Sequence, residues 1–232
     1  MGHYVRLKAA DGFEFDAWRA DPAGKPCAGL VIAMGIFGVN DYIRGQVDHF
    51  AELGFATIAP AVFDRVHRGV DLGIESEAGD EGRRIRGLAK EADMMLDLEA
   101  AAAAARPAGK VAILGYCWGG CLAWMGATRT KAFDCCVSYY GGGVYERRNE
   151  TPTCPVQFHF GDSDRIVPME HIDSIRAANP DIPTFVYRAG HAFATVGRNS
   201  FDAEATRQAE QRALAFLAKH TGPGGDRIRA TG

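Results

Sequence analysis

The sequence of 232 residues predicts one α/β domain, in which a mostly parallel sheet is covered by helices on both faces. From residue 28 onward, short apolar runs typical of buried strands alternate with segments whose apolar residues recur at helical spacing. A hydrophobic fraction of 47% is ample for a single large core. We find no internal repeat or linker, so one domain is expected over 1–221, followed by a disordered tail over 222–232.

The first thirty residues depart from this alternation. Tyr4–Leu7 and Phe13–Trp18 alternate apolar and polar side chains, and between them lies Asp11-Gly12, a dipeptide typical of tight turns. These runs predict a β-hairpin at the edge of the sheet.

The later elements are assigned from length and period. Strands are expected over 29–34, 56–60, 111–114, 133–140, 155–160 and 184–187, and helices over 41–53, 169–178 and 202–220. One long helix is expected where a single apolar stripe recurs at three- and four-residue intervals: Ile85, Leu88, Ala92, Met95, Leu98 and Ala102. Residues 61–82 are polar and contain glycines, which predicts either an excursion over a functional site or a mobile loop.

Composition narrows the classes of partner. A net charge of −3 gives no reason to expect nucleic acid or an anionic membrane, so a small-molecule substrate is the simplest expectation. The N-terminus lacks the apolar core of a signal peptide and no run is long enough to span a membrane, which favours a cytoplasmic protein. We expect it to be a monomer or small homo-oligomer.

The six cysteines show no Cys-x-x-Cys spacing and are expected to be reduced thiols. Cys117 and Cys121 share a helical face but have too few neighbouring ligands for zinc, so no metal or cofactor is expected.

Gly115-Tyr116-Cys117-Trp118-Gly119 follows the apolar run at 111–114 and predicts a strand, a sharp turn and a helix with a thiol at the apex. The flanking glycines let the backbone fold tightly back, and the start of the helix directs free N–H groups at the sulfur, which favours the thiolate. The alternative is that Cys117 is a small apolar residue at a strand end, because free cysteine is often buried.

A thiol nucleophile needs a base and a group that orients the base. Asp162 and Asp164 follow the strand that ends at Phe160, and His191 follows the strand that ends near Arg188. The chain order nucleophile, acid, histidine, each at the carboxyl end of a strand, is the order of the α/β-hydrolases. The alternatives are a turn or helix cap for the aspartates and a surface position for the histidine.

An oxyanion hole would use the backbone N–H after the nucleophile and a second N–H from the loop after an earlier strand. Trp118 supplies the first, and Ile36 is the best candidate for the second because its loop joins a buried strand to a helix. The alternative is a plain strand-to-helix turn that uses Gly35 and Gly38 for backbone freedom.

Four segments are specific in combination, although none is so alone: Ile36–Asn40, Gly115–Gly120, Gly161–Pro168 and Gly190–Ala194. With them the chain resembles, from about Gly29 to Leu217, the dienelactone hydrolase family, the cysteine-bearing branch of the α/β-hydrolases. The resemblance implies acyl transfer through a thioester on Cys117, and it matches Asp164 rather than Asp162 to the acid that orients His191.

Two positions depart from the family pattern. Where those enzymes carry a glutamate held to deprotonate the cysteine, this chain has Gly35, and where they carry an arginine for the substrate carboxylate, it has Thr195. Arg198 is a candidate substitute, as is one of Arg83, Arg84 and Arg86.

These observations predict a hydrolase of small esters or lactones with a more open site than its relatives. Apolar walls are expected from Phe37, Trp118, Tyr140 and Phe193, although each aromatic is as consistent with ordinary core. Two alternatives remain: the same groups could attack phosphorus esters, or Cys117 could be a redox-responsive thiol that Cys121 resolves.

Overall fold

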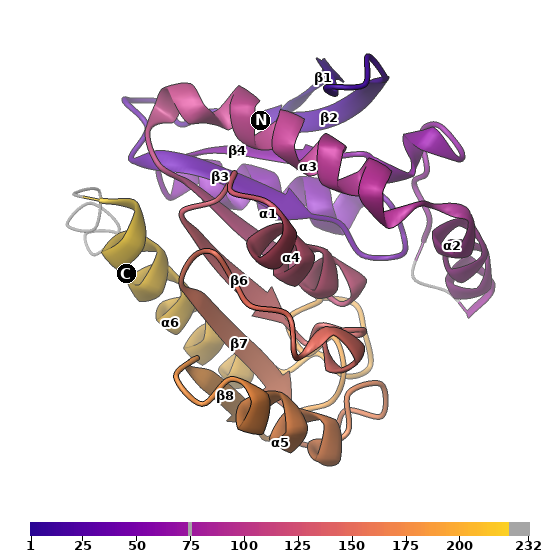
Figure 1. Cartoon of the computed structure of the whole chain (residues 1–232), viewed down its shortest axis with the longest axis vertical. Helices are drawn as coiled ribbons and strands as arrows, with labels where there is room; N and C mark the ends of the chain where they lie inside the picture. Colours follow the sequence, from indigo (N-terminus) through magenta and orange to yellow (C-terminus); the bar gives the residue numbers. More distant parts are fainter. Residues whose placement is uncertain (74–75, 223–232) are drawn as a thin grey trace.

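An eight-stranded sheet forms the centre of the computed structural model, which describes residues 1–73 and 76–222. The strand order is β1-β2-β4-β3-β5-β6-β7-β8 (Figure 1). Strands β3 to β8 are parallel to their neighbours among themselves, whereas β1 and β2 form an antiparallel hairpin and β2 runs antiparallel to β4. Their bounds are β1 His3–Lys8, β2 Glu14–Ala20, β3 Ala28–Ala33, β4 Phe55–Pro60, β5 Val111–Tyr116, β6 Cys135–Tyr139, β7 Val156–Gly161 and β8 Thr184–Tyr187. The predicted α/β class and edge hairpin are confirmed.

Helices cover both faces of the sheet. Figure 1 shows α1 and α6 behind the strands and α3, α4 and α5 in front of them. The bounds are α1 Asp41–Glu52, α2 Ser76–Leu88, α3 Glu91–Ala105, α4 Trp118–Arg129, α5 Met169–Ala178 and α6 Ala203–Thr221. Helix α1 begins where Asn40 accepts a hydrogen bond from the Ile43 N–H, and α6 where Asp202 accepts one from the Ala205 N–H, so both starts are capped by side chains.

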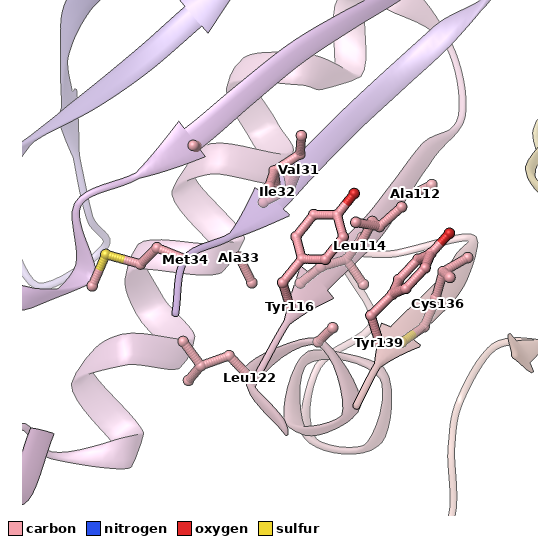
Figure 2. Packing of buried hydrophobic residues seen from close by; sticks show 14 of the residues in the cluster. Val31, Ile32, Ala33, Met34, Ala112, Leu114, Tyr116, Leu122, Cys136 and Tyr139 are labelled. Carbon is pink, nitrogen blue, oxygen red and sulfur yellow. The ribbon is translucent and has the colours of Figure 1, made fainter. Parts of the chain in front are cut away.

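The core is densest around β3, β5 and β6. Every residue of these strands is buried, which explains why their sequences are continuous apolar runs rather than alternating ones. In Figure 2, Leu122 of α4 lies below this part of the sheet, and the rings of Tyr116 and Tyr139 lie side by side, with centroids 5.0 Å apart. A rigid framework therefore supports the end of β5.

The order of the strands also marks where a ligand would bind. Strand β3 lies between β4 and β5, so the chain continues from β3 to β4 on one side of it and then crosses back to β5 on the other side. In open parallel sheets the crevice beyond the carboxyl ends of the strands at this reversal is the usual binding place.

One sequence expectation about the middle of the chain was wrong, and a second segment contains helices that the sequence did not indicate. The stripe from Ile85 to Ala102 is not one helix, because α2 ends at Leu88 and the extended backbone of Lys90 starts α3. The segment 61–82 is not simply loop, since it contains a short 3-10 helix at Val62–Arg65 and most of α2.

The first part of this segment lies against the loop that follows β3. The N–H of Leu72 donates to the Phe37 carbonyl, and Gly38 forms an isolated bridge with Asp71. Of the two alternatives considered for residues 61–82, an excursion over neighbouring structure fits these contacts.

The tail expected over 222–232 lies, from residue 223 onward, outside the described residues. Within 1–73 and 76–222, none of the helices combines the length and apolar character that crossing a bilayer requires.

Candidate active site

Cys117 occupies the sharp turn between β5 and α4. Its φ of 58° lies in the left-handed region that non-glycine residues seldom adopt. The turn depends on its glycines: a Cβ at Gly115 would lie 1.9 Å from the Gly119 carbonyl oxygen, and one at Gly119 would lie 2.1 Å from the Ala33 carbonyl oxygen. Only glycine allows β5, α4 and the end of β3 to approach this closely, and the thiol is thereby held at the carboxyl end of the sheet.

His191 and Asp164 meet Cys117 there. The Nε2 atom of His191 lies 3.2 Å from the Cys117 Sγ, and its Nδ1 lies 2.7 Å from the Asp164 Oδ2. The other carboxylate oxygen of Asp164 accepts hydrogen bonds from the backbone N–H groups of Ile166 and Val167. A buried carboxylate is thus fixed by its own loop and in turn fixes the imidazole.

Asp162 has a different environment. It is exposed, and its Oδ1 accepts a hydrogen bond from the neighbouring Ser163 hydroxyl. Between the two aspartates, the structure brings Asp164 to the histidine.

The three groups shift each other's protonation. Burial alone would raise the pKa of the Cys117 thiol, but the hydrogen bond and charge of His191, with the Trp118 backbone N–H, outweigh burial and hold that pKa below its ordinary value. Burial likewise disfavours the imidazolium, yet the hydrogen bonds to Asp164 and Cys117 raise the pKa of His191 above its ordinary value. Both directions favour a thiolate beside an imidazolium.

A cavity of about 380 Å³ opens above the thiol. The loop after β3 supplies one wall through Gly35, Ile36 and Phe37, while Cys117 and His191 also face the space. Most of the remaining lining is apolar, as in pockets for small organic ligands.

The backbone groups expected to stabilise an oxyanion lie near this cavity. The Trp118 N–H hydrogen-bonds the Cys117 sulfur, and Ile36 lines the cavity. Gly35 leaves space beside the nucleophile: a Cβ there would lie 3.5 Å from the Tyr116 carbonyl oxygen and 3.9 Å from the Cys117 Cβ, both ordinary contacts.

Of the aromatic residues expected to form walls of the cavity, some line it and others are buried in the core. Phe37 lines the cavity, whereas Trp118 is buried with its ring stacked on Phe63 at 5.1 Å. Tyr140 and Phe193 are fully buried and lie outside the lining, where the Tyr140 ring packs 5.2 Å from that of His191. Tyr140 thus supports the histidine from the core, and the Phe193 ring packs 5.2 Å from that of Tyr140.

The lining residues that sequence reasoning did not assign to the site include Tyr42, Tyr116 and Ile166. Tyr116 and Ile166 adjoin Cys117 and Asp164 in the sequence, and that adjacency was a usable signal. Tyr42, on α1, carries none, because only the folded chain brings this helix to the site.

The arginines considered as substrate contacts also differ in their positions relative to the cavity. Arg83 and Arg198 line the cavity, with the Arg198 guanidinium 4.7 Å from the centre of the Phe37 ring. Arg86 lies 5.5 Å from the Trp118 ring, and Arg84 is exposed and paired with Glu81.

Cys121 is 1% exposed, and burial raises its pKa to about 11, which makes it a poor partner for thiol exchange. Across residues 1–73 and 76–222, no cluster of three or more His, Cys, Asp or Glu side chains is arranged to hold a metal ion.

The strand order reverses between β4 and β5, and a nucleophile candidate, an acid and a histidine follow β5, β7 and β8 in that order. This arrangement places the protein among the α/β-hydrolases. Its family can be stated more closely. Residues 15–221 match the model of the dienelactone hydrolase family, so the chain belongs to this family and is a hydrolase.

Individual relatives agree. The carboxymethylenebutenolidase of Pseudomonas putida is 34% identical over 227 residues, spanning 92% of this chain and 95% of that protein. The carboxymethylenebutenolidase of Pseudomonas sp. strain P51 is 36% identical over 229 residues, spanning 93% and 94%.

Among solved structures, a candidate dienelactone hydrolase from Klebsiella pneumoniae subsp. pneumoniae MGH 78578 superposes with a TM-score of 0.80 at 24% identity, covering 94% of this chain and 99% of that one. A dienelactone hydrolase-like promiscuous phosphotriesterase from metagenomic libraries gives 0.74 at 20% identity, covering 95% and 99%. At these identities the two structures bear on the fold alone, and both have the fold described above.

Proposed function

We propose that the protein hydrolyses small carboxylic esters or lactones, with Cys117 as nucleophile, His191 as acid and base, and Asp164 as the group that orients His191. The observation that carries the proposal is the hydrogen-bonded series Cys117–His191–Asp164 at the floor of an apolar cavity. The curated relatives are named for hydrolysis of a butenolide, a lactone, which supports this substrate class.

In the first half-reaction the Cys117 thiolate attacks the carbonyl carbon. The carbonyl π electrons move to oxygen, where the N–H groups of Ile36 and Trp118 would stabilise the negative charge. When the carbonyl re-forms, the bond to the alcohol or enol oxygen breaks, and that oxygen takes the proton from His191 Nε2. The product of this step is a thioester on Cys117 with a neutral His191.

In the second half-reaction His191 removes a proton from water, and the hydroxide oxygen attacks the thioester carbon. The tetrahedral intermediate collapses with loss of the Cys117 thiolate, so the carboxylic acid leaves and the thiolate–imidazolium pair returns. Asp164 stabilises the imidazolium in both halves without accepting its proton.

The proposed specificity follows from the cavity walls. With Gly35 beside the sulfur, His191 is the evident base for Cys117, and the space of the missing side chain admits bulkier acyl groups. Arg198 and Arg83 are the proposed contacts for a negatively charged substituent of the substrate, because both residues line the cavity.

The proposal is tested by assaying p-nitrophenyl acetate, a dienelactone and an aryl phosphotriester with the parent, Cys117→Ala and His191→Ala. Each substitution should lower kcat/KM for the carbon esters by roughly 10³-fold or more. The matched control is Cys154→Ala, which removes a part-buried thiol. Burial raises the pKa of that thiol to about 11.

Acid quenching during turnover should trap a thioester that mass spectrometry assigns to Cys117. Full activity in Cys117→Ala would refute the proposal. Turnover of the phosphotriester alone would favour phosphorus esters, and ready peroxide oxidation of Cys117 without turnover of any of the three substrates would favour a redox role.

A further inference from the structure

Helix α2 lies close to the loop after β3 where Gly82 meets Ile36. Gly82 is buried in this helix, and a Cβ there would lie 2.2 Å from the Ile36 carbonyl oxygen and 3.0 Å from the Ile36 carbonyl carbon. Both neighbours are backbone atoms, which cannot rotate away as a side chain would. The helix can rest on this loop only because residue 82 has no side chain.

The same helix also reaches Trp118. The Arg86 guanidinium, one helical turn after Gly82, lies 5.5 Å from the Trp118 ring, and Phe63 stacks on that ring with a centroid separation of 5.1 Å. A cation placed against an aromatic ring is held by the ring's electrostatic field. Trp118 is thus fixed by α2 and by the segment after β4.

Among the described residues, the ion pairs of α2 do not join it to the rest of the chain. Figure 1 shows it apart from the helices that cover the two faces of the sheet. Ile85 is buried, but Leu88 is 58% exposed, and the ion pairs Asp80–Arg83 and Glu81–Arg84 lie within the helix itself. The position of α2 relative to the site therefore depends strongly on Gly82 and Arg86.

Ile36 and Trp118 are the two residues whose backbone N–H groups form the oxyanion hole of the proposed function. We infer that α2 sets the geometry of this hole, with Gly82 and Arg86 as positioning residues for Ile36 and Trp118, respectively. The inference rests on the proposed function, and it goes further by giving the excursion between β4 and α3 a role in transition-state stabilisation rather than in substrate contact alone.

The inference predicts different effects on two reactions of Cys117, ester hydrolysis and alkylation. Ester hydrolysis forms an oxyanion and needs both N–H groups in place, whereas alkylation by iodoacetamide is a displacement at a saturated carbon and forms none. A shift of the Ile36 backbone should slow turnover without slowing alkylation. A general loss of structure around the thiol would slow both reactions.

The decisive variant is Gly82→Ala, with Gly87→Ala as its matched control. Gly87 lies in the same helix with nothing within 4 Å of its Cβ position, so its substitution makes the same chemical change without a clash. For p-nitrophenyl acetate, Gly82→Ala should lower kcat by about 10- to 100-fold with little change in KM. It should weaken inhibition by a trifluoromethyl ketone, which forms an oxyanion on Cys117, by a similar factor. The alkylation rate should match that of the parent, and Gly87→Ala should behave as the parent in all assays.

A Gly82→Ala enzyme with parental kcat, or one whose alkylation and turnover fall together, would overturn the inference. If circular dichroism shows that Gly82→Ala does not fold, Arg86→Met takes its place, because it keeps an apolar stem on α2 and removes only the cation. This variant should lower kcat by about 3- to 10-fold and weaken inhibition by the trifluoromethyl ketone by a similar factor, and unchanged kcat would overturn the inference. Loss of activity in Cys117→Ala with parental activity in Gly82→Ala would reject this inference and leave the proposed function standing.

Discussion

The Sγ of Cys117 and the Nε2 of His191 are 3.2 Å apart across the carboxyl ends of β5 and β8, and each shifts the pKa of the other toward the charged pair. A thiol near its ordinary pKa would be mostly protonated at neutral pH. In the proposed function, this pair therefore supplies the activation of Cys117.

This pairing predicts the pH dependence of Cys117 reactivity. Since the thiol pKa is lowered from the ordinary 9.0, the rate of alkylation by iodoacetamide should rise with pH and reach half its maximum below pH 9.0. His191→Ala removes the proton partner and should move the midpoint upward. Identical midpoints in the parent and His191→Ala would show that the imidazole does not activate the thiol.

The two aspartates give a second prediction. In Asp164→Asn the remaining oxygen can still accept the N–H groups of Ile166 and Val167, but an amide no longer stabilises an imidazolium. We expect kcat/KM for p-nitrophenyl acetate to fall by roughly 10²- to 10⁴-fold with an intact fold. Asp162→Asn, two residues away and exposed, is the control and should retain parental activity.

A third prediction concerns Gly35→Glu. The Cβ fits at 3.9 Å from the Cys117 Cβ, so the fold should tolerate the side chain, and its negative charge should disfavour the thiolate and slow alkylation by iodoacetamide. If the family glutamate directs specificity, the ratio of dienelactone to p-nitrophenyl acetate turnover should rise. Gly35→Gln has the same shape without the charge and should leave alkylation close to parental. Unchanged alkylation and substrate ratio in Gly35→Glu would contradict the prediction.

A fourth prediction concerns stability and uses His159, which is fully buried between the Tyr187 hydroxyl and the Gln157 side chain. Burial, aided by Arg212, lowers its pKa from 6.5 to about 3. The unfolded chain therefore binds a proton below pH 6.5 that the folded chain refuses until about pH 3, so this residue destabilises the fold as pH decreases through that window.

Urea unfolding at about pH 7.5 and pH 5 measures the effect. The free energy of unfolding should fall between these conditions by roughly 2 kcal/mol more in the parent than in His159→Gln. An equal fall in both proteins would show that His159 is not the group that titrates.

The sequence predicted those parts of the fold whose signals are local. Val111–Tyr116 is a buried strand because its apolar run is continuous, and α5 has the predicted bounds, Met169–Ala178. The resemblance and the positions at strand ends also selected Cys117, Asp164 and His191, which the structure brings together.

What the sequence left open depends on tertiary contact. The first part of helix α2, which contains Gly79 and Gly82, was not expected as helix, because the reason for Gly82 is its approach to Ile36, far away in the sequence. The break at Lys90 is hidden because the apolar stripe keeps its period across it. Tyr140 and Phe193 lie near the site along the chain, but their side chains are buried in the core.

His191, the proposed base for Cys117, lies 74 residues after it, at the edge of the sheet that is last in the chain. During synthesis, or when the β7–β8 end of the sheet opens locally, the chain carries a cysteine of ordinary reactivity that electrophiles attack slowly at neutral pH. The thiolate becomes favoured when both distant loops have docked, because the contact with His191 lowers the pKa of the thiol. The labelling rate of this one sulfur is therefore a direct measure of whether the carboxyl-terminal third of the molecule has finished folding.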